Sequence, residues 1–149
     1  MNTLNIDTPV GKMYLASDGE NITELKFGMC EKDSPDAVLF KAKTELEEYF
    51  AGQRKAFSLP LKPKGTPFQL CVWRTLREIP YGETATYGEI AKRIGNTKAC
   101  RAVGMANNRN PIAIIVPCHR VIGAGGSLTG YAGGLDKKEF LLNLEAQRR

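Results

Sequence analysis

The sequence is poor in the residues that build metal sites and disulfide frameworks. Its 149 residues include one histidine and four cysteines, and no two cysteines form a Cys-x-x-Cys pair. We therefore expect no zinc ribbon, zinc finger or other bound metal. The start of the chain has neither a basic segment nor a long apolar run, which predicts no secretion signal, no membrane span, and free thiols in a reducing cytoplasm.

Acidic side chains are scarce in the second part of the chain. Residues 1–60 carry 7 basic and 10 acidic side chains, whereas residues 61–149 carry 14 and 6, so the net charge changes from −3 to +8. An excess of positive charge favours a polyanionic partner such as nucleic acid, through phosphate neutralisation and counterion release. A solvated basic surface without such a partner stays open at this point.

The first 60 residues are predicted to form a small structural lobe. Short strands are expected in residues 1–28, where Asp18-Gly19 predicts a hairpin turn between residues 12–16 and 22–27. Ser34-Pro35 predicts the N-cap and first position of a helix that continues to Gly52. Prolines and a glycine in residues 59–65 indicate an interlobe linker, which separates a lobe at 1–60 from a domain at 61–149.

Helix start signals dominate the next segment. Capping boxes at residues 66–69 and 86–89 predict helices that reach about Ile79 and Ile94, and Asn96-Thr97 predicts the start of a helix through Asn107. The last two helices share a tight glycine-containing turn and form a helix-turn-helix pattern at about 87–107. An ordinary helical hairpin fits the same pattern equally well.

The rest of the chain combines a buried strand, a flexible loop and a final helix. The β-branched run 112–116 predicts a buried strand that leads into Pro117-Cys118-His119-Arg120. The glycine-rich loop 123–134 lacks the spacing of a phosphate loop or dinucleotide fingerprint, so no nucleotide cofactor is expected. Residues 136–139 predict the cap of a helix that buries Phe140, Leu141 and Leu144. The fold class is a two-lobe α/β (α+β) protein whose second lobe is mainly helical.

Cys118 is a candidate nucleophile. A thiol attacks carbon only as the thiolate, which is scarce at neutral pH unless a base or a cation lies nearby. His119 is the only histidine, so an imidazole base must be this residue, oriented by a carboxylate. An isolated Cys-His dipeptide would more often be a buried thiol beside a surface histidine, and the surrounding motifs decide between the two interpretations.

The motifs around Cys118 resemble those of the O6-alkylguanine-DNA alkyltransferases. The resemblance is strong over residues 66–147 and extends to the first lobe only in layout. It rests on Arg101-Ala102-Val103-Gly104, Asn110-Pro111, Val116-Pro117-Cys118-His119-Arg120-Val121-Ile122, Gly130-Tyr131-Ala132-Gly133-Gly134 and Lys138-Glu139-Phe140-Leu141-Leu142. It implies a methylated-DNA–protein-cysteine methyltransferase that acts once per molecule and needs no cofactor, with transfer from O6-alkylguanine and also from O4-alkylthymine.

The resemblance also implies catalytic roles. Cys118 would accept the alkyl group irreversibly, His119 would be the base acting through a water, Glu145 would orient His119, and Asn110 would brace the turn that carries the cysteine.

Further roles concern the DNA, which is expected to be double-stranded and to contain an alkylated base. Arg101 would enter the minor groove and fill the gap left by the extruded nucleotide, and Tyr87 would assist flipping and hydrogen-bond guanine N3. Carbonyls of Cys118 and Val121 would accept from the guanine amine, while Tyr131 and Ala132 would cover the lesion. A monomer is expected, and cooperative binding on DNA is left open.

Three alternatives stay open from the sequence. The chain could bind alkylated DNA without transfer, although such proteins replace the cysteine. It could be a transcription regulator, although the predicted second motif helix offers few base-reading side chains. It could also be a cysteine hydrolase or redox enzyme, which would turn over many times.

Overall fold

The computed structural model describes residues 1–147 and divides into two compact units. The first unit comprises residues 1–64 and 111–115, and the second comprises residues 65–110 and the described residues from 116 onward. Both strands and helices are present, so the predicted mixed α+β class is confirmed. The elements are β1 (Asn2–Thr8), β2 (Gly11–Ser17), β3 (Ile22–Phe27), α1 (Ala37–Phe50), α2 (Pro67–Leu76), β4 (Ala85–Thr86), α3 (Tyr87–Arg93), α4 (Cys100–Asn108), η1 (Cys118–Arg120), β5 (Val121–Ile122), η2 (Ala124–Gly126) and α5 (Leu135–Gln147).

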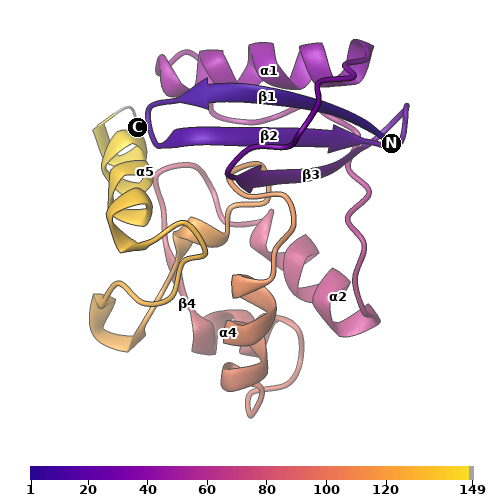
Figure 1. The fold of residues 1–149 in the computed structure, drawn as a ribbon. Helices are drawn as coiled ribbons and strands as arrows, with labels where there is room; N and C mark the ends of the chain where they lie inside the picture. Colours follow the sequence, from indigo (N-terminus) through magenta and orange to yellow (C-terminus); the bar gives the residue numbers. More distant parts are fainter. Residues whose placement is uncertain (148–149) are drawn as a thin grey trace. The chain divides into compact units, whose positions relative to one another are not determined.

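The first unit is an antiparallel sheet covered by one helix. The strands follow the order β1-β2-β3, and α1 packs along the sheet (Figure 1). The predicted hairpin is present, with Leu15 opposite Leu25 and a bulge between Ala16 and Ser17. Leu15 and Leu25 are fully buried, which gives this unit its own apolar core.

Helix α1 begins two residues later than the Ser34-Pro35 signal predicts. Asp36 is the N-cap, and its carboxylate accepts a hydrogen bond of 2.9 Å from the backbone N–H of Leu39. Ser34 instead exchanges backbone hydrogen bonds of 3.3 and 2.8 Å with Thr3. Pairing with the edge of β1 therefore keeps Ser34 extended, and the predicted N-cap is wrong.

Two distant segments complete the free edge of β3. The backbone of Ile22 bonds to Pro60 and Lys62, and the backbone of Leu25 bonds to Pro111 and Ala113, at 2.8–3.0 Å. The predicted strand at residues 112–116 is therefore reduced to a single bridge between Leu25 and Ile112.

The chain turns immediately after that bridge. Ile115 donates a 2.7 Å hydrogen bond to the Ala113 carbonyl, and Ile114 adopts a φ of 70°. These apolar side chains are buried as expected, but the tight turn prevents a regular strand.

The second unit is built from helices with well-defined starts. Thr66 with Gln69 and Thr86 with Glu89 form the two predicted capping boxes, which begin α2 and α3. Helix α4 begins at residue 100 after an N-cap, Ala99, that makes no side-chain cap bond, so the predicted start at Asn96-Thr97 is wrong.

The α4 start is delayed because a separate turn occupies residues 96–99. In that turn the Asn96 carbonyl accepts a 3.0 Å bond from the Ala99 N–H.

A side-chain hydrogen bond joins α2 to α4. The indole N–H of Trp73 on α2 donates a 2.8 Å hydrogen bond to the Ala106 carbonyl in the body of α4.

Helix α5 presents a polar inward face. Lys138, Leu141 and Glu145 are buried at the spacing of one helix face, whereas Phe140 is 41% exposed, so the predicted burial of Phe140 is wrong. Phe140 precedes Leu141 by one residue, which places it about 100° away around the helix. None of the helices found in residues 1–147 has the length and apolar character needed to cross a membrane.

Candidate active site

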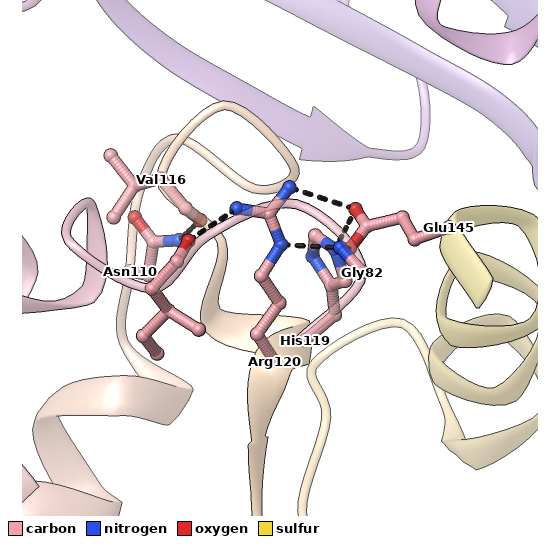
Figure 2. Close-up of polar contacts among 7 residues, drawn as sticks. Gly82, Asn110, Val116, His119, Arg120 and Glu145 are labelled. Carbon is pink, nitrogen blue, oxygen red and sulfur yellow. Dashed lines mark hydrogen bonds and ion pairs between the residues drawn. The ribbon is translucent and has the colours of Figure 1, made fainter. Parts of the chain in front are cut away.

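Cys118 lies at the start of a tight turn that two asparagines support. It opens the short 3₁₀ helix η1, and its side chain is buried, with the residue only 5% exposed. The side-chain amide of Asn110 donates to the Val116 carbonyl at 2.8 Å (Figure 2), and that of Asn107 donates to the Cys118 carbonyl at 3.3 Å. The backbone before and after the thiol is thereby held by side chains at the end of α4 and directly after it.

His119 and Glu145 meet in the interior of the second unit. The His119 Nε2 atom lies 2.7 Å from Glu145 Oε2, and both side chains are essentially inaccessible to water (Figure 2). The imidazole lies on η1 and the carboxylate lies on α5. The two residues are 26 positions apart in the sequence, and they meet because η1 packs against α5. The structure thus brings together two of the residues that the sequence singled out.

Arg120 also binds this carboxylate, and the sequence analysis gave it no role. Its guanidinium donates to both carboxylate oxygens of Glu145, at 2.8 and 3.0 Å, and to the Ile79 carbonyl at 2.8 Å. A forked, two-bond contact of this kind fixes the orientation of a carboxylate better than a single bond. The available signal was the position of Arg120 directly after Cys118-His119, in the same motif.

The charges within this cluster define its resting state. Burial raises the pKa of the Glu145 carboxyl, but hydrogen bonding and charge from His119, followed by those from Arg120, outweigh burial and leave the pKa far below its ordinary value. Burial lowers the pKa of His119 despite the attraction of Glu145. The pair is therefore an ionised carboxylate and a neutral imidazole at neutral pH.

This protonation state leaves a base on His119. Because ionised Glu145 can only accept, the imidazole proton must sit on Nε2, and Nδ1 keeps a free lone pair. Nδ1 is buried and has no hydrogen-bond partner among residues 1–147. A buried acceptor of this kind is costly unless it is used, and a proton from a nearby donor would satisfy it.

The Cys118 thiol is protonated in the resting protein. Burial raises its pKa to about 11, although Asn110 and the Lys138 ammonium both act to lower it. The thiolate that attacks carbon is thus rare at neutral pH. Any attack by this sulfur must therefore remove the proton, and a neutral imidazole lies in the next residue of the chain.

Lys138 is the second site residue that the sequence analysis missed. Its ammonium is fully buried and donates to the Val121 carbonyl at 2.5 Å and to the Thr129 carbonyl at 2.7 Å. Burial lowers its pKa, while a Cys118 thiolate would act in the opposite direction. The spacing of Lys138, Leu141 and Glu145 along one helix face could have revealed it.

The remaining predicted residues are distributed around this cluster. The pKa of the Tyr131 phenol is raised well above its ordinary value, first by burial and then by the charges of Cys118 and Glu145. Tyr87 begins α3, and its hydroxyl accepts a 3.0 Å hydrogen bond from the Thr129 side chain. Ala132 is exposed, and Arg101 is exposed on α4 without an ion pair inside residues 1–147.

The described residues also include the side-chain types that usually bind metal ions. Across the part of the chain that the structure describes, no group of three or more His, Cys, Asp and Glu side chains could hold a metal ion. The groups that the cluster itself offers are a thiol, a neutral imidazole and a fixed carboxylate.

Known proteins resemble the chain over nearly its whole length. Residues 67–147 match the DNA binding domain of 6-O-methylguanine DNA methyltransferase, and residues 4–63 match its ribonuclease-like domain. A methylated-DNA–protein-cysteine methyltransferase from Methanosarcina acetivorans is 58% identical, with 93% of this chain and 94% of the relative covered.

Two solved structures with DNA are also similar. Mycobacterium tuberculosis OGT in complex with DNA is 50% identical with a TM-score of 0.91, covering 99% of this chain and 94% of that one. S. pombe Atl1 in complex with damaged DNA containing O6-carboxymethylguanine is 33% identical with a TM-score of 0.50, covering 55% of this chain and 78% of that one. The resemblance found in the sequence is thus confirmed, and the chain belongs to the 6-O-methylguanine DNA methyltransferase family.

Proposed function

We propose that the protein repairs DNA by moving an alkyl group from O6 of guanine to Cys118, as a methylated-DNA–protein-cysteine methyltransferase that reacts once. The observation that carries this proposal is the buried Cys118 thiol directly before the His119–Glu145 pair, in a chain of this family. No cofactor takes part, because the thiol itself is the acceptor.

The transfer balances without a further reagent. The Cys118 sulfur forms a bond to the alkyl carbon while the bond between that carbon and guanine O6 breaks, and the electron pair leaves with the base. The thiol proton passes through a water to Nδ1 of His119. The imidazolium then releases it and the departing guanine takes up one proton, so that no proton is gained or lost overall. Glu145 stabilises the imidazolium that forms transiently, as a carboxylate does in other three-part nucleophilic sites. The thioether product is stable, so the protein does not turn over.

A buried acceptor requires that the base leave the helical stack. Cys118 is 5% exposed, and a base paired inside duplex DNA cannot reach it. Arg101 is exposed on α4 and makes no ion pair within residues 1–147, which suits the proposed role of filling the gap through the minor groove. Tyr87 is proposed to assist the flip and to donate its phenolic O–H to guanine N3, where charge develops as the base leaves.

The extruded guanine would be read mainly by backbone groups. The carbonyls of Cys118 and Val121 are proposed to accept from the guanine amine. The Cys118 carbonyl already accepts from the Val121 N–H and the Asn107 amide, and the Val121 carbonyl accepts from the Lys138 ammonium, so the guanine amine would share or displace these bonds. Tyr131 and Ala132 would cover the base. The same pocket would accept O4-alkylthymine, which presents its alkyl oxygen in the corresponding position.

The proposed partner is double-stranded DNA that contains an alkylated base. Residues 61–149 carry the net positive charge, and the relatives whose structures contain DNA support this partner. We further propose that the protein acts as a monomer in the cytoplasm, and cooperative binding along DNA is a separate outcome of binding titrations.

Mass spectrometry tests the transfer directly. The protein is mixed with a slight excess of duplex carrying one O6-methylguanine, and the intact mass and peptide map are recorded. We expect one added methylene group per molecule on the Cys118 peptide, none in Cys118→Ala, and the wild-type result in the control Cys30→Ala.

The second candidate function is binding to alkylated DNA without transfer. The raised pKa of the Cys118 thiol is the observation that favours it, because a thiol at rest is a poor nucleophile. Tight binding to the lesion with no added mass would establish this function instead.

The role of Arg101 has its own test. Arg101→Ala should slow reaction with alkylated duplex DNA by about 10-fold or more, the amount that one lost contact of 1.4 kcal/mol or more gives. Reaction with the free alkylated base should be unchanged, and equal losses on both substrates would contradict the role.

A further inference from the structure

The hydroxyl of Tyr87 is already engaged by the glycine-rich loop. Thr129 Oγ1 donates to it at 3.0 Å, across 42 residues of sequence. A phenol oxygen that accepts one hydrogen bond keeps its own proton as a donor. The O–H bond of a phenol prefers the plane of the ring, which leaves two positions for the proton, so a donor on one side of the oxygen directs the phenolic proton to the other side.

The backbone of Thr129 is fixed independently of its side chain. Its carbonyl accepts a 2.7 Å hydrogen bond from the buried Lys138 ammonium, which also donates a 2.5 Å hydrogen bond to the Val121 carbonyl. Thr129 thus links the first residue of α3 to β5 and α5 within the second unit.

The next residue presses against α4. Gly130 has a φ of 33°, and a Cβ built on it would lie 2.9 Å from the Asn108 amide nitrogen, so a larger residue would have to displace that side chain. The loop therefore runs tightly past the end of α4 directly after Thr129, which restricts where the Thr129 hydroxyl can point.

We propose that Thr129 is a positioning residue for the alkyl transfer, which orients the Tyr87 hydroxyl so that its proton faces the departing base. This inference rests on the proposed function and adds a residue to which the sequence analysis gave no role. Thr129 does not contact the substrate; it acts through Tyr87, and its own carbonyl is anchored by Lys138. Accepting a bond also polarises the phenol and strengthens it as a donor.

A pair of substitutions separates this role from packing. Thr129→Val keeps the size of the side chain and removes the hydroxyl, whereas Thr129→Ser keeps the hydroxyl. Single-turnover rate constants are measured at saturating duplex carrying one O6-methylguanine. We expect Thr129→Val to react about 3- to 10-fold more slowly, the effect of one neutral hydrogen bond, with unchanged DNA affinity. Thr129→Ser should return close to the wild-type rate constant.

A double substitution provides the decisive comparison. In a Tyr87→Phe background the hydroxyl that Thr129 orients is gone, so Thr129→Val should cause no further slowing. Ser127→Ala, which alters an exposed hydroxyl of the same loop, is the matched control and should react like the wild type.

Two results would overturn the proposal. One is an equal slowing by Thr129→Val with and without the Tyr87 hydroxyl, which would assign Thr129 to loop structure. The other is weakened DNA affinity with an unchanged saturating rate constant. Failure of the proposed function itself looks different, because the wild-type protein would then gain no methylene group on Cys118.

Discussion

Among residues 1–147, each unit buries one glutamate, and the two carboxylates have different surroundings. Glu45 in the first unit is 3% exposed and accepts from the backbone N–H and the hydroxyl of Ser58, both at 2.9 Å, with Arg54 at 3.6 Å. Glu145 in the second unit is 1% exposed and binds Arg120 and His119. Burial and an arginine partner are therefore common to both residues. What distinguishes Glu145 is a partner that can gain and lose a proton near neutral pH.

The largest expected difference between the two glutamates is in alkyl transfer. Glu145→Gln removes the charge that stabilises the His119 imidazolium, and we expect the single-turnover rate constant to fall about 100-fold or more. Glu45→Gln should leave that rate constant unchanged. Quenched-flow transfer from O6-methylguanine duplex measures both, and an equal loss in the two variants would remove the distinction.

The acid side of the pH–rate profile sharpens the role of His119. Its pKa lies below the ordinary value, so the imidazole stays neutral and basic as the pH falls through 6.5. We expect the rate constant to decline only below that pH, by about tenfold per pH unit once His119 is protonated. A decline centred above pH 6.5 would show a raised pKa and would contradict the assigned resting state.

Glu45 should matter for stability instead of rate. Replacing it with glutamine places an amide N–H where Ser58 needs an acceptor, which should lower the free energy of unfolding by about 1–3 kcal/mol. Urea unfolding followed by far-UV circular dichroism measures this loss. Lys41→Gln serves as the control, because its exposed ammonium also contacts Ser58, through the carbonyl.

The smallest expected effect concerns acid stability. The folded pKa of Glu145 lies below its ordinary value of 4.5, so its contribution to stability is present above pH 4.5 and is lost as the pH falls toward the folded pKa. The wild type should lose at most about 1.4 kcal/mol per pH unit more than Glu145→Gln in this range. Fluorescence of Trp73, the single tryptophan, follows unfolding of the second unit.

The sequence predicted helix starts well where a single nearby side chain determines the backbone conformation. The capping boxes at Thr66 and Thr86 are present because each satisfies backbone groups within four residues. Ser34 fails as a cap because Thr3, 31 residues away, competes for the same groups. Local rules carry no information about such a competitor.

The candidate site shows the same limit. The Cys118-His119 motif pointed to His119, the family resemblance pointed to Glu145, and the structure places the two side chains 2.7 Å apart. Thr129 has no local signature that distinguishes it from another loop threonine, and for Lys138 the only local signal is its spacing with Leu141 and Glu145 along one helix face. Their importance arises only when α5, β5 and the glycine-rich loop meet.

The raised pKa of Cys118 has a consequence for the lifetime of the unused protein. Peroxides and disulfides react with thiolates, so a buried thiol with a pKa of about 11 is protected from sulfenic acid formation and from mixed disulfides. Cys100 is exposed, and we expect its thiol to be oxidised before that of Cys118. A protein that reacts only once would thus keep its acceptor intact through oxidative stress until an alkylated base is presented to it.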